Sequence, residues 1–181
     1  MDIALIGYGE VGRILAEDLR AQGVAVSAYD LKLDSEHGKP LREHASAHGV
    51  TLGAAHAQAV HGVGLVISAV TASQAVPVAQ ACAPALKPGA WFLDFNSASP
   101  GAKIAAAAAV DSAGGRYVEG AVMTAITAHR VRVPLLLGGP HAAALAPVLQ
   151  GLGFAPIVAS TRRRTASHSP PLMSTRCGRP T

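Results

Sequence analysis

The glycine-rich turn near the N-terminus limits the possible folds of this chain more than any other feature. A short apolar run, residues 3–6, passes directly into Gly7-Tyr8-Gly9-Glu10-Val11-Gly12, which has the spacing G-x-G-x-x-G. In a strand-turn-helix unit the first glycine turns the chain, the second lets backbone N–H groups approach a pyrophosphate, and the third lets the helix pack on the strand. The helix start then directs unpaired N–H groups at the phosphates. The residues predicted to contact a dinucleotide here are Gly7, Gly9, Glu10, Val11 and Gly12.

An acidic residue ends the second predicted strand. A helix is expected over residues 10–22, and an apolar run, residues 24–29, then ends in Asp30. A carboxylate about 20 residues beyond the glycines accepts hydrogen bonds from the ribose hydroxyls of a dinucleotide. Its position favours a dinucleotide site over the simpler alternative that the glycines only close a tight turn. Asp30 would repel the extra phosphate of NADP, so the expected cofactor is NAD or NADP with NAD favoured, although Lys32 offers that phosphate a partner.

Apolar runs alternate with helical segments as far as residue 160. Further strands are expected at 50–52, 64–71, 90–95, 116–122, 131–137 and 154–158, and further helices at 41–48, 72–86, 101–113 and 141–149. This βαβ rhythm predicts an α/β, Rossmann-type fold with a doubly wound, mostly parallel sheet. Ligands of such sheets bind beyond the carboxyl ends of the strands. Val70, Thr71 and Asn96 follow two of the expected central strands and are therefore predicted to line the cofactor site.

The positive charge of the chain is confined to its C-terminal segment. Residues 1–160 contain ten basic and eleven acidic residues, a net charge of −1, whereas residues 161–181 contain five arginines and no acid. A nucleic-acid-binding protein needs a basic face on its folded part, so that class is not expected. The absence of a long apolar segment or signal-like region predicts a cytoplasmic protein without membrane contact. Cys82 and Cys177 lie in unlike contexts, which predicts neither a disulfide framework nor a cysteine metal site.

Residues 161–181 differ in character from the rest of the chain. They contain several prolines and arginines and few residues that form a core, so they are expected to be a disordered basic tail. A targeting or binding role is one interpretation. The other is a shifted reading frame or a truncation after residue 160. The expected organisation is one Rossmann domain over residues 1–160, followed by this tail.

Five histidines follow the second predicted strand. They are His37, His44, His48, His56 and His61. His44 and His48 are four residues apart and can share a helical face. No cysteine, aspartate or glutamate completes a recognisable zinc pattern in the sequence. Solvated surface histidines are therefore expected, and no metal site is predicted.

With these elements placed, residues 1–160 resemble the N-terminal cofactor domain of the β-hydroxyacid dehydrogenases, which include 6-phosphogluconate and 3-hydroxyisobutyrate dehydrogenases. The resemblance rests on the glycine turn, on Ile67-Ser68-Ala69-Val70-Thr71, and on Asp94-Phe95-Asn96-Ser97-Ala98-Ser99-Pro100 in place of the family's D-x-S-T-x-x-P substrate loop. It implies an NAD(P)-dependent oxidoreductase acting on a small hydroxyacid. The D-F-N-S-x-S-P loop is most similar to a branch near the threonate-type dehydrogenases. The family pattern implies that Asn96 and Ser97 contact the substrate.

Two departures from the family pattern affect the expected activity. The family's Ser-Gly-Gly segment falls on Met123, Thr124 and Ala125, so Met123 and Thr124 are the expected substrate contacts but the acid accepted is not implied. No lysine follows Lys103, so the family's catalytic lysine, its G-x-x-x-K-x-x-x-N pattern and its helical C-terminal domain are not found.

The catalytic residue is therefore unknown. Lys103 and His129 are the candidate bases, and each is more simply an exposed surface residue. The chain is expected to bind cofactor with little or no dehydrogenase activity, and apolar surface at residues 140–158 is expected to cause self-association. The alternative from another class is a non-catalytic dinucleotide-binding or sensing module.

Overall fold

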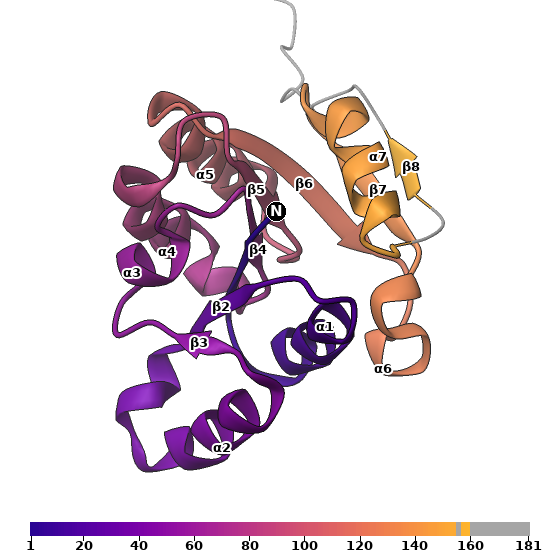
Figure 1. The fold of residues 1–181 in the computed structure, drawn as a ribbon. Coiled ribbons are helices and arrows are strands. Elements are labelled where there is room, and N and C mark those ends of the chain that lie inside the picture. Colours follow the sequence, from indigo (N-terminus) through magenta and orange to yellow (C-terminus); the bar gives the residue numbers. More distant parts are fainter. Residues whose placement is uncertain (155–156, 160–181) are drawn as a thin grey trace, which may run out of the picture.

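The computed structural model describes residues 1–154 and 157–159, which form one eight-stranded sheet with helices on both faces (Figure 1). The strand order is β3-β2-β1-β4-β5-β6-β7-β8. The strands are β1 (Ile3–Ile6), β2 (Val26–Tyr29), β3 (Thr51–Leu52), β4 (Leu65–Ser68), β5 (Trp91–Asp94), β6 (Arg116–Val122), β7 (Leu135–Gly138) and β8 (Ile157–Ala159). All neighbours pair in parallel except β6 and β7, which are antiparallel. The mostly parallel, doubly wound Rossmann-type sheet is thereby confirmed.

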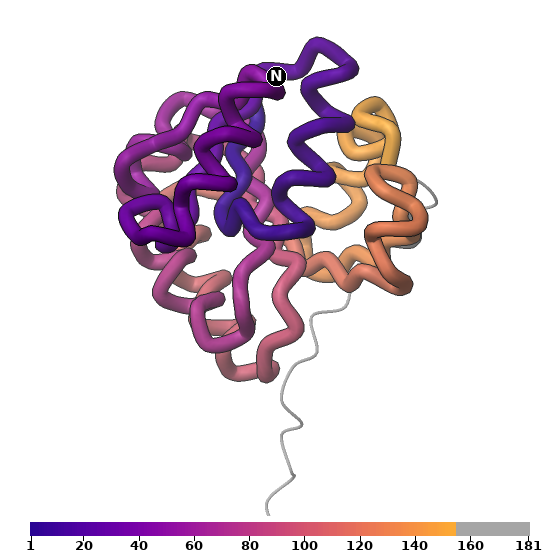
Figure 2. The backbone as a smooth tube through the Cα atoms, turned by 90° about the horizontal axis from the view of Figure 1, so that it is seen from below, coloured from indigo at the N-terminus to yellow at the C-terminus, as the bar shows by residue number. Residues whose placement is uncertain are grey.

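Seven α-helices are described. They are α1 (Glu10–Ala21), α2 (Lys39–His48), α3 (His56–Val60), α4 (Ala75–Cys82), α5 (Pro100–Ser112), α6 (Ile126–His129) and α7 (Ala142–Gly151). In Figure 1, α3, α4 and α5 lie on one side of the sheet, whereas α1 lies on the other. Figure 2 shows α1, in indigo, between the purple segment that contains α2 and the orange segment that contains α6. Helix α1 is therefore flanked by two elements that are far apart in the sequence.

The centre of the sheet explains the continuous apolar runs of the sequence. Every residue of β1, β4 and β5 is buried, because helices cover both faces of these parallel strands. The last residues of β4 and β5 are Ser68 and Asp94, which are both polar and buried and which pair with each other in the parallel register. Polar side chains are thus placed at the edge where ligands of such sheets bind.

Several expected elements begin or end elsewhere in the structure. The strand expected at 131–137 starts only at Leu135, because residues 130–132 form a 3₁₀ turn. The helix expected at 72–86 is divided into a 3₁₀ turn, α4 and a second 3₁₀ turn. Helix α3 was not predicted from the sequence. The strand expected at 154–158 is found as β8 at Ile157–Ala159. Residues 155–156 and 160, and the whole basic tail, residues 161–181, lie outside the described residues.

In the part of residues 140–158 that the structure describes with side chains, the large hydrophobic side chains are buried or half-buried. Leu145, Leu149 and Phe154 are fully buried. The exposed large hydrophobic side chains of the described residues are Met1, Leu31, Ile104, Met123 and Leu136. Ala143, Ala144 and Pro147 of the same segment are exposed, so an uncovered apolar surface there stays a prediction. No helix among the described residues has the length and apolar character needed to cross a membrane.

Candidate functional site

In the glycine turn between β1 and α1, the three glycines are explained by different local surroundings. Gly7 has a φ of +92°, and a Cβ there would collide with the backbone of Ala69 on the neighbouring strand end. A Cβ on Gly12 would collide with the carbonyl oxygen of Gly7. A Cβ on Gly9 would meet no protein atom within 4 Å. Gly7 and Gly12 are therefore required by the turn itself, whereas Gly9 leaves open space in front of α1.

The first turn of α1 has no side-chain cap. Gly9 is the N-cap residue and offers no side-chain acceptor to the free N–H groups of the helix start. Such N–H groups, together with the helix dipole, favour an anion at this position. The turn thus combines open space with unpaired donors, which is the arrangement that a pyrophosphate requires.

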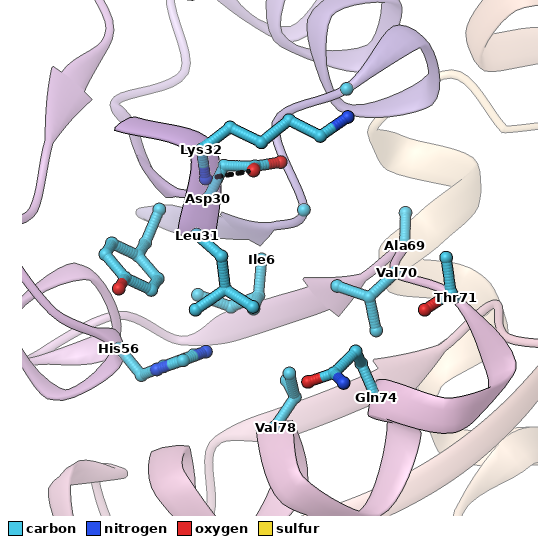
Figure 3. Close-up of a pocket in the computed structure, with 13 residues that line it drawn as sticks. Ile6, Asp30, Leu31, Lys32, His56, Ala69, Val70, Thr71, Gln74 and Val78 are labelled. Carbon is cyan, nitrogen blue, oxygen red and sulfur yellow. Dashed lines mark hydrogen bonds between the residues drawn. The ribbon is translucent and has the colours of Figure 1, made fainter. Parts of the chain in front are cut away.

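Asp30 follows β2 and connects its end to the glycine turn. One carboxylate oxygen accepts a hydrogen bond from the backbone N–H of Tyr8 at 2.9 Å, and the other accepts one from the N–H of Lys32 at 2.9 Å. Each carboxylate oxygen has a second lone pair, so further hydrogen bonds remain available to a ligand. In Figure 3 the Lys32 side chain runs past the Asp30 carboxylate. The carboxylate and the exposed ammonium group therefore lie at the same edge of the cleft.

A cavity of about 410 Å³ lies along this edge (Figure 3). Its lining includes Gly7, Gly9, Tyr29, Asp30, Leu31, Lys32, His56, Val70, Thr71, Gln74 and Val78. The His56 ring packs against Tyr29 with ring centroids 4.5 Å apart, and burial lowers the pKa of His56 below its usual range. The His56 ring is therefore mainly neutral at neutral pH, and this half-buried ring forms part of the wall of the cavity. No spacing pattern in the sequence indicated His56 as part of this site.

A second cavity, of about 340 Å³, continues the first beyond Ala69 and Val70, which line both. Its lining is Val11, Ala69, Val70, Phe95, Asn96, Val122, Thr124 and Ile126. None of these described residues has a side chain that titrates near neutral pH. The two cavities together form a cleft that crosses the carboxyl ends of the central strands.

Asn96 connects the strands at the centre of the cleft. Its Oδ1 accepts a hydrogen bond from the N–H of Val70 at 2.7 Å, and its Nδ2 donates to Ser68 Oγ at 3.1 Å. Its own backbone N–H donates to Asp94 Oδ1 at 2.8 Å. Asn96 is buried, so these contacts hold the loop after β5 against the end of β4.

The expectation that Lys103 is an exposed lysine was wrong. Lys103 is only 8% exposed, and its Nζ donates to Asp94 Oδ2 at 3.0 Å. The Tyr117 hydroxyl donates to the same oxygen at 2.6 Å. Asp94 is 1% exposed, and its carboxylate accepts hydrogen bonds from these two donors and from the N–H of Asn96. Lys103 lines a separate cavity of about 220 Å³ between α5 and β6, which does not include the cleft residues.

The structure brings together most of the residues predicted to form the site. Gly7, Gly9, Asp30, Val70 and Thr71 line the first cavity, and Val11, Asn96 and Thr124 line the second. Gly12 is buried beneath the turn. Glu10, Ser97 and Met123 are exposed and line neither cavity. His129 is exposed, as expected, and lines a separate shallow hollow with Asp18 on α1.

The family model for the NAD-binding domain of 6-phosphogluconate dehydrogenase matches residues 2–158. This chain belongs to that family. The glycine turn, Asp30 and the residues that line the cleft all lie within the matched residues. No curated protein matches the chain.

Solved structures give the same architecture. A conserved hypothetical protein from Sinorhizobium meliloti 1021 is 34% identical, with a TM-score of 0.82 over 89% of this chain and 55% of that one. MTH1747, described as structurally similar to 3-hydroxyacid dehydrogenases, is 26% identical, with a TM-score of 0.75 over 90% and 58% of the two chains. The 3-hydroxyisobutyrate dehydrogenase of Mycobacterium tuberculosis, solved with L-serine, is 21% identical, with a TM-score of 0.75 over 87% and 53%. The chain therefore spans little more than half the length of these proteins.

Proposed function

We propose that this chain is the NAD(P)-binding domain of an oxidoreductase that acts on a small hydroxyacid. The observation that carries the proposal is the continuous cleft from the glycine turn to Asn96. Its first cavity offers Asp30 to a ribose and Gly9 with the start of α1 to a pyrophosphate. Its second cavity provides a mainly apolar place for the nicotinamide ring, with Asn96 and Thr124 at its edge. The family match supports this assignment, as does the likeness to MTH1747, which is itself described as structurally similar to 3-hydroxyacid dehydrogenases.

The residues of the cleft indicate which steps the cofactor would perform and which the protein would perform. When bound, the nicotinamide ring would accept a hydride from the substrate or donate one to it. The residues of this chain bind the dinucleotide, orient it across the strand ends and exclude water from one side. Asn96, Ser97, Met123 and Thr124 are the proposed substrate contacts. Of these, Ser97 and Met123 would need a ligand or a further structural element above the cleft to become part of a closed site.

We expect NAD to bind about tenfold more tightly than NADP. The Asp30 carboxylate would accept hydrogen bonds from a ribose and would repel a 2′-phosphate, and a difference of 1.4 kcal/mol corresponds to a factor of ten. Calorimetric titration with both cofactors at moderate salt measures this ratio. The variant Lys32→Ala serves as a control, because it should weaken NADP binding and leave NAD binding unchanged. Tighter binding of NADP by the unmodified chain would contradict the preference.

The 181-residue chain is expected to bind cofactor with little or no turnover. No described residue of the second cavity can remove the proton of a substrate hydroxyl, and a positioned base contributes about 10²- to 10⁴-fold to such a reaction. A typical enzyme turns over about ten times per second, so turnover should lie below about 0.1 per second. The measurement is cofactor reduction with 6-phosphogluconate, 3-hydroxyisobutyrate and threonate. Turnover of about one per second with any of them would exclude this prediction.

A non-catalytic dinucleotide-binding or sensing module is the second candidate function. It is favoured by the same lack of a titratable side chain in the described part of the second cavity. Cofactor binding without turnover, together with no effect of hydroxyacids on cofactor affinity, would support it. Mutual strengthening of cofactor and hydroxyacid binding would favour the oxidoreductase, because binding couplings between two ligands are reciprocal. Self-association remains a prediction that size-exclusion chromatography can test.

A further inference from the structure

We propose that Glu17, His44 and His48 form a binding site for one zinc-type divalent metal ion between α1 and α2. This inference goes beyond the proposed dinucleotide site, since none of the three residues lines the cleft. Each residue offers one ligand atom, and the three atoms lie within 4.8 Å of one another. Two imidazole nitrogens and one carboxylate oxygen, with water in the fourth position, are a donor set that suits zinc.

The helix geometry already places two of the three ligands together. His44 and His48 are one turn apart on α2, so their side chains share a face. Their rings stack with centroids 4.4 Å apart. His48 is exposed and can turn towards an ion without moving the backbone. The sequence shows this pair, but the carboxylate comes from α1, 27 residues before His44.

The distance between His44 and Glu17 fits a shared ion. His44 Nε2 lies 3.0 Å from Glu17 Oε1. Zinc–nitrogen and zinc–oxygen bonds of about 2.0–2.2 Å place two neighbouring ligand atoms of a tetrahedral site roughly 3.3 Å apart. In the metal-free protein, a proton on Nε2 can bridge these atoms. The ion takes the Nε2 lone pair instead, and the ring proton is then carried by Nδ1.

The outer contacts of the cluster are already formed. The Tyr8 hydroxyl lies 2.9 Å from His44 Nδ1, and its oxygen can accept a hydrogen bond from the Nδ1–H group that metal binding requires. Arg130 donates to Glu17 Oε2 at 2.7 Å and leaves Oε1 directed at His44. Partners of this kind orient metal ligands and are a regular part of metal sites.

The structure explains why Arg130 stays in this position. Arg130 has a φ of +53°, an uncommon conformation for a residue with a side chain. It also donates to Asp18 Oδ1 at 2.8 Å, and the N–H of Val131 donates to Asp18 Oδ2 at 2.9 Å. These contacts bind the segment after α6 to the side of α1 that faces away from α2 (Figure 2). A metal ion would therefore link α2 to α1, whose opposite side already contacts Arg130 and Val131.

The test is calorimetric titration of Zn²⁺ into the full chain. His168→Ala and Cys177→Ser are introduced throughout, because histidine and cysteine of the C-terminal segment can themselves bind zinc. One Zn²⁺ per chain is expected. His48→Ala and Glu17→Gln should each reduce the affinity at least about tenfold, since even the loss of an outer partner typically costs 10- to 100-fold. His61→Ala, a change at an exposed histidine outside the cluster, is the matched control and should leave the affinity unchanged.

Tyr8→Phe tests the outer contact separately. It keeps the ring in the core and removes only the hydroxyl that faces His44 Nδ1, so Zn²⁺ affinity should fall about 10- to 100-fold. Because His48 is exposed, His48→Ala should not change the melting temperature of the metal-free protein, which shows that the fold is intact. Equal zinc binding by the parent chain and His48→Ala would overturn the proposal. The absence of stoichiometric binding by the parent chain would do the same.

Discussion

Replacing Gly9 by alanine is expected to lower the affinity for NAD or NADP by about 10- to 100-fold and to leave the fold intact. A Cβ at Gly9 meets no protein atom within 4 Å, and Gly9 lies at the start of α1 on the wall of the first cavity. The added methyl group would occupy the space that a pyrophosphate needs. Loss of one charge-assisted hydrogen bond costs about 1.5–3 kcal/mol, and 1.4 kcal/mol is a factor of ten.

Calorimetry with each cofactor measures this loss, and the melting temperature of the cofactor-free variant shows whether the fold is kept. Gly101→Ala is the matched control, because a Cβ there also meets no protein atom and Gly101 lies on α5, outside the cleft. Gly12→Ala should behave differently, since its Cβ would collide with the Gly7 carbonyl oxygen and destabilise the turn itself. Unchanged cofactor affinity in Gly9→Ala would exclude the glycine turn as the pyrophosphate site.

Replacing Lys103 by methionine is expected to destabilise the domain by about 3–5 kcal/mol, because it removes one partner of a buried ion pair. Methionine keeps most of the volume of the lysine stem but leaves the Asp94 carboxylate with Tyr117 and the N–H of Asn96 as donors. Asp94 is 1% exposed, so its carboxylate has little access to solvent in place of the ammonium group. At about 2–4 °C per kcal/mol for a chain of this size, the melting temperature should fall by about 10 °C.

Urea unfolding of Lys103→Met and of the exposed-lysine control Lys87→Met measures the difference. The control should stay within about 0.5 kcal/mol of the parent chain, as is usual for surface substitutions. The double variant Lys103→Met with Asp94→Asn should be more stable than Lys103→Met alone, because no buried charge is then left without its partner. Equal stability of Lys103→Met and Lys87→Met would mean that the 3.0 Å contact contributes nothing to folding.

The comparison of Lys103 and Asp30 explains which parts of the site were predictable. Asp30 follows the glycine turn at a spacing that the βαβ unit itself imposes, so its place at the cleft follows from local sequence. Lys103 sits in the first turn of α5, where the sequence is equally compatible with an exposed side chain. Its burial depends on Asp94 from β5 and Tyr117 from β6, which only the parallel register brings to the same place.

The sequence by itself determined the class of the fold and the place of the glycine turn. Both depend on local rules: buried parallel strands are continuous apolar runs, and a G-x-G-x-x-G turn needs residues that are adjacent in the chain. Only the tertiary structure decided that Asn96 holds two strand ends together, that β7 runs antiparallel to β6, and that Glu17 meets His44. These features depend on contacts between residues 26 or more positions apart or on strand direction, neither of which leaves a periodic signal in the sequence.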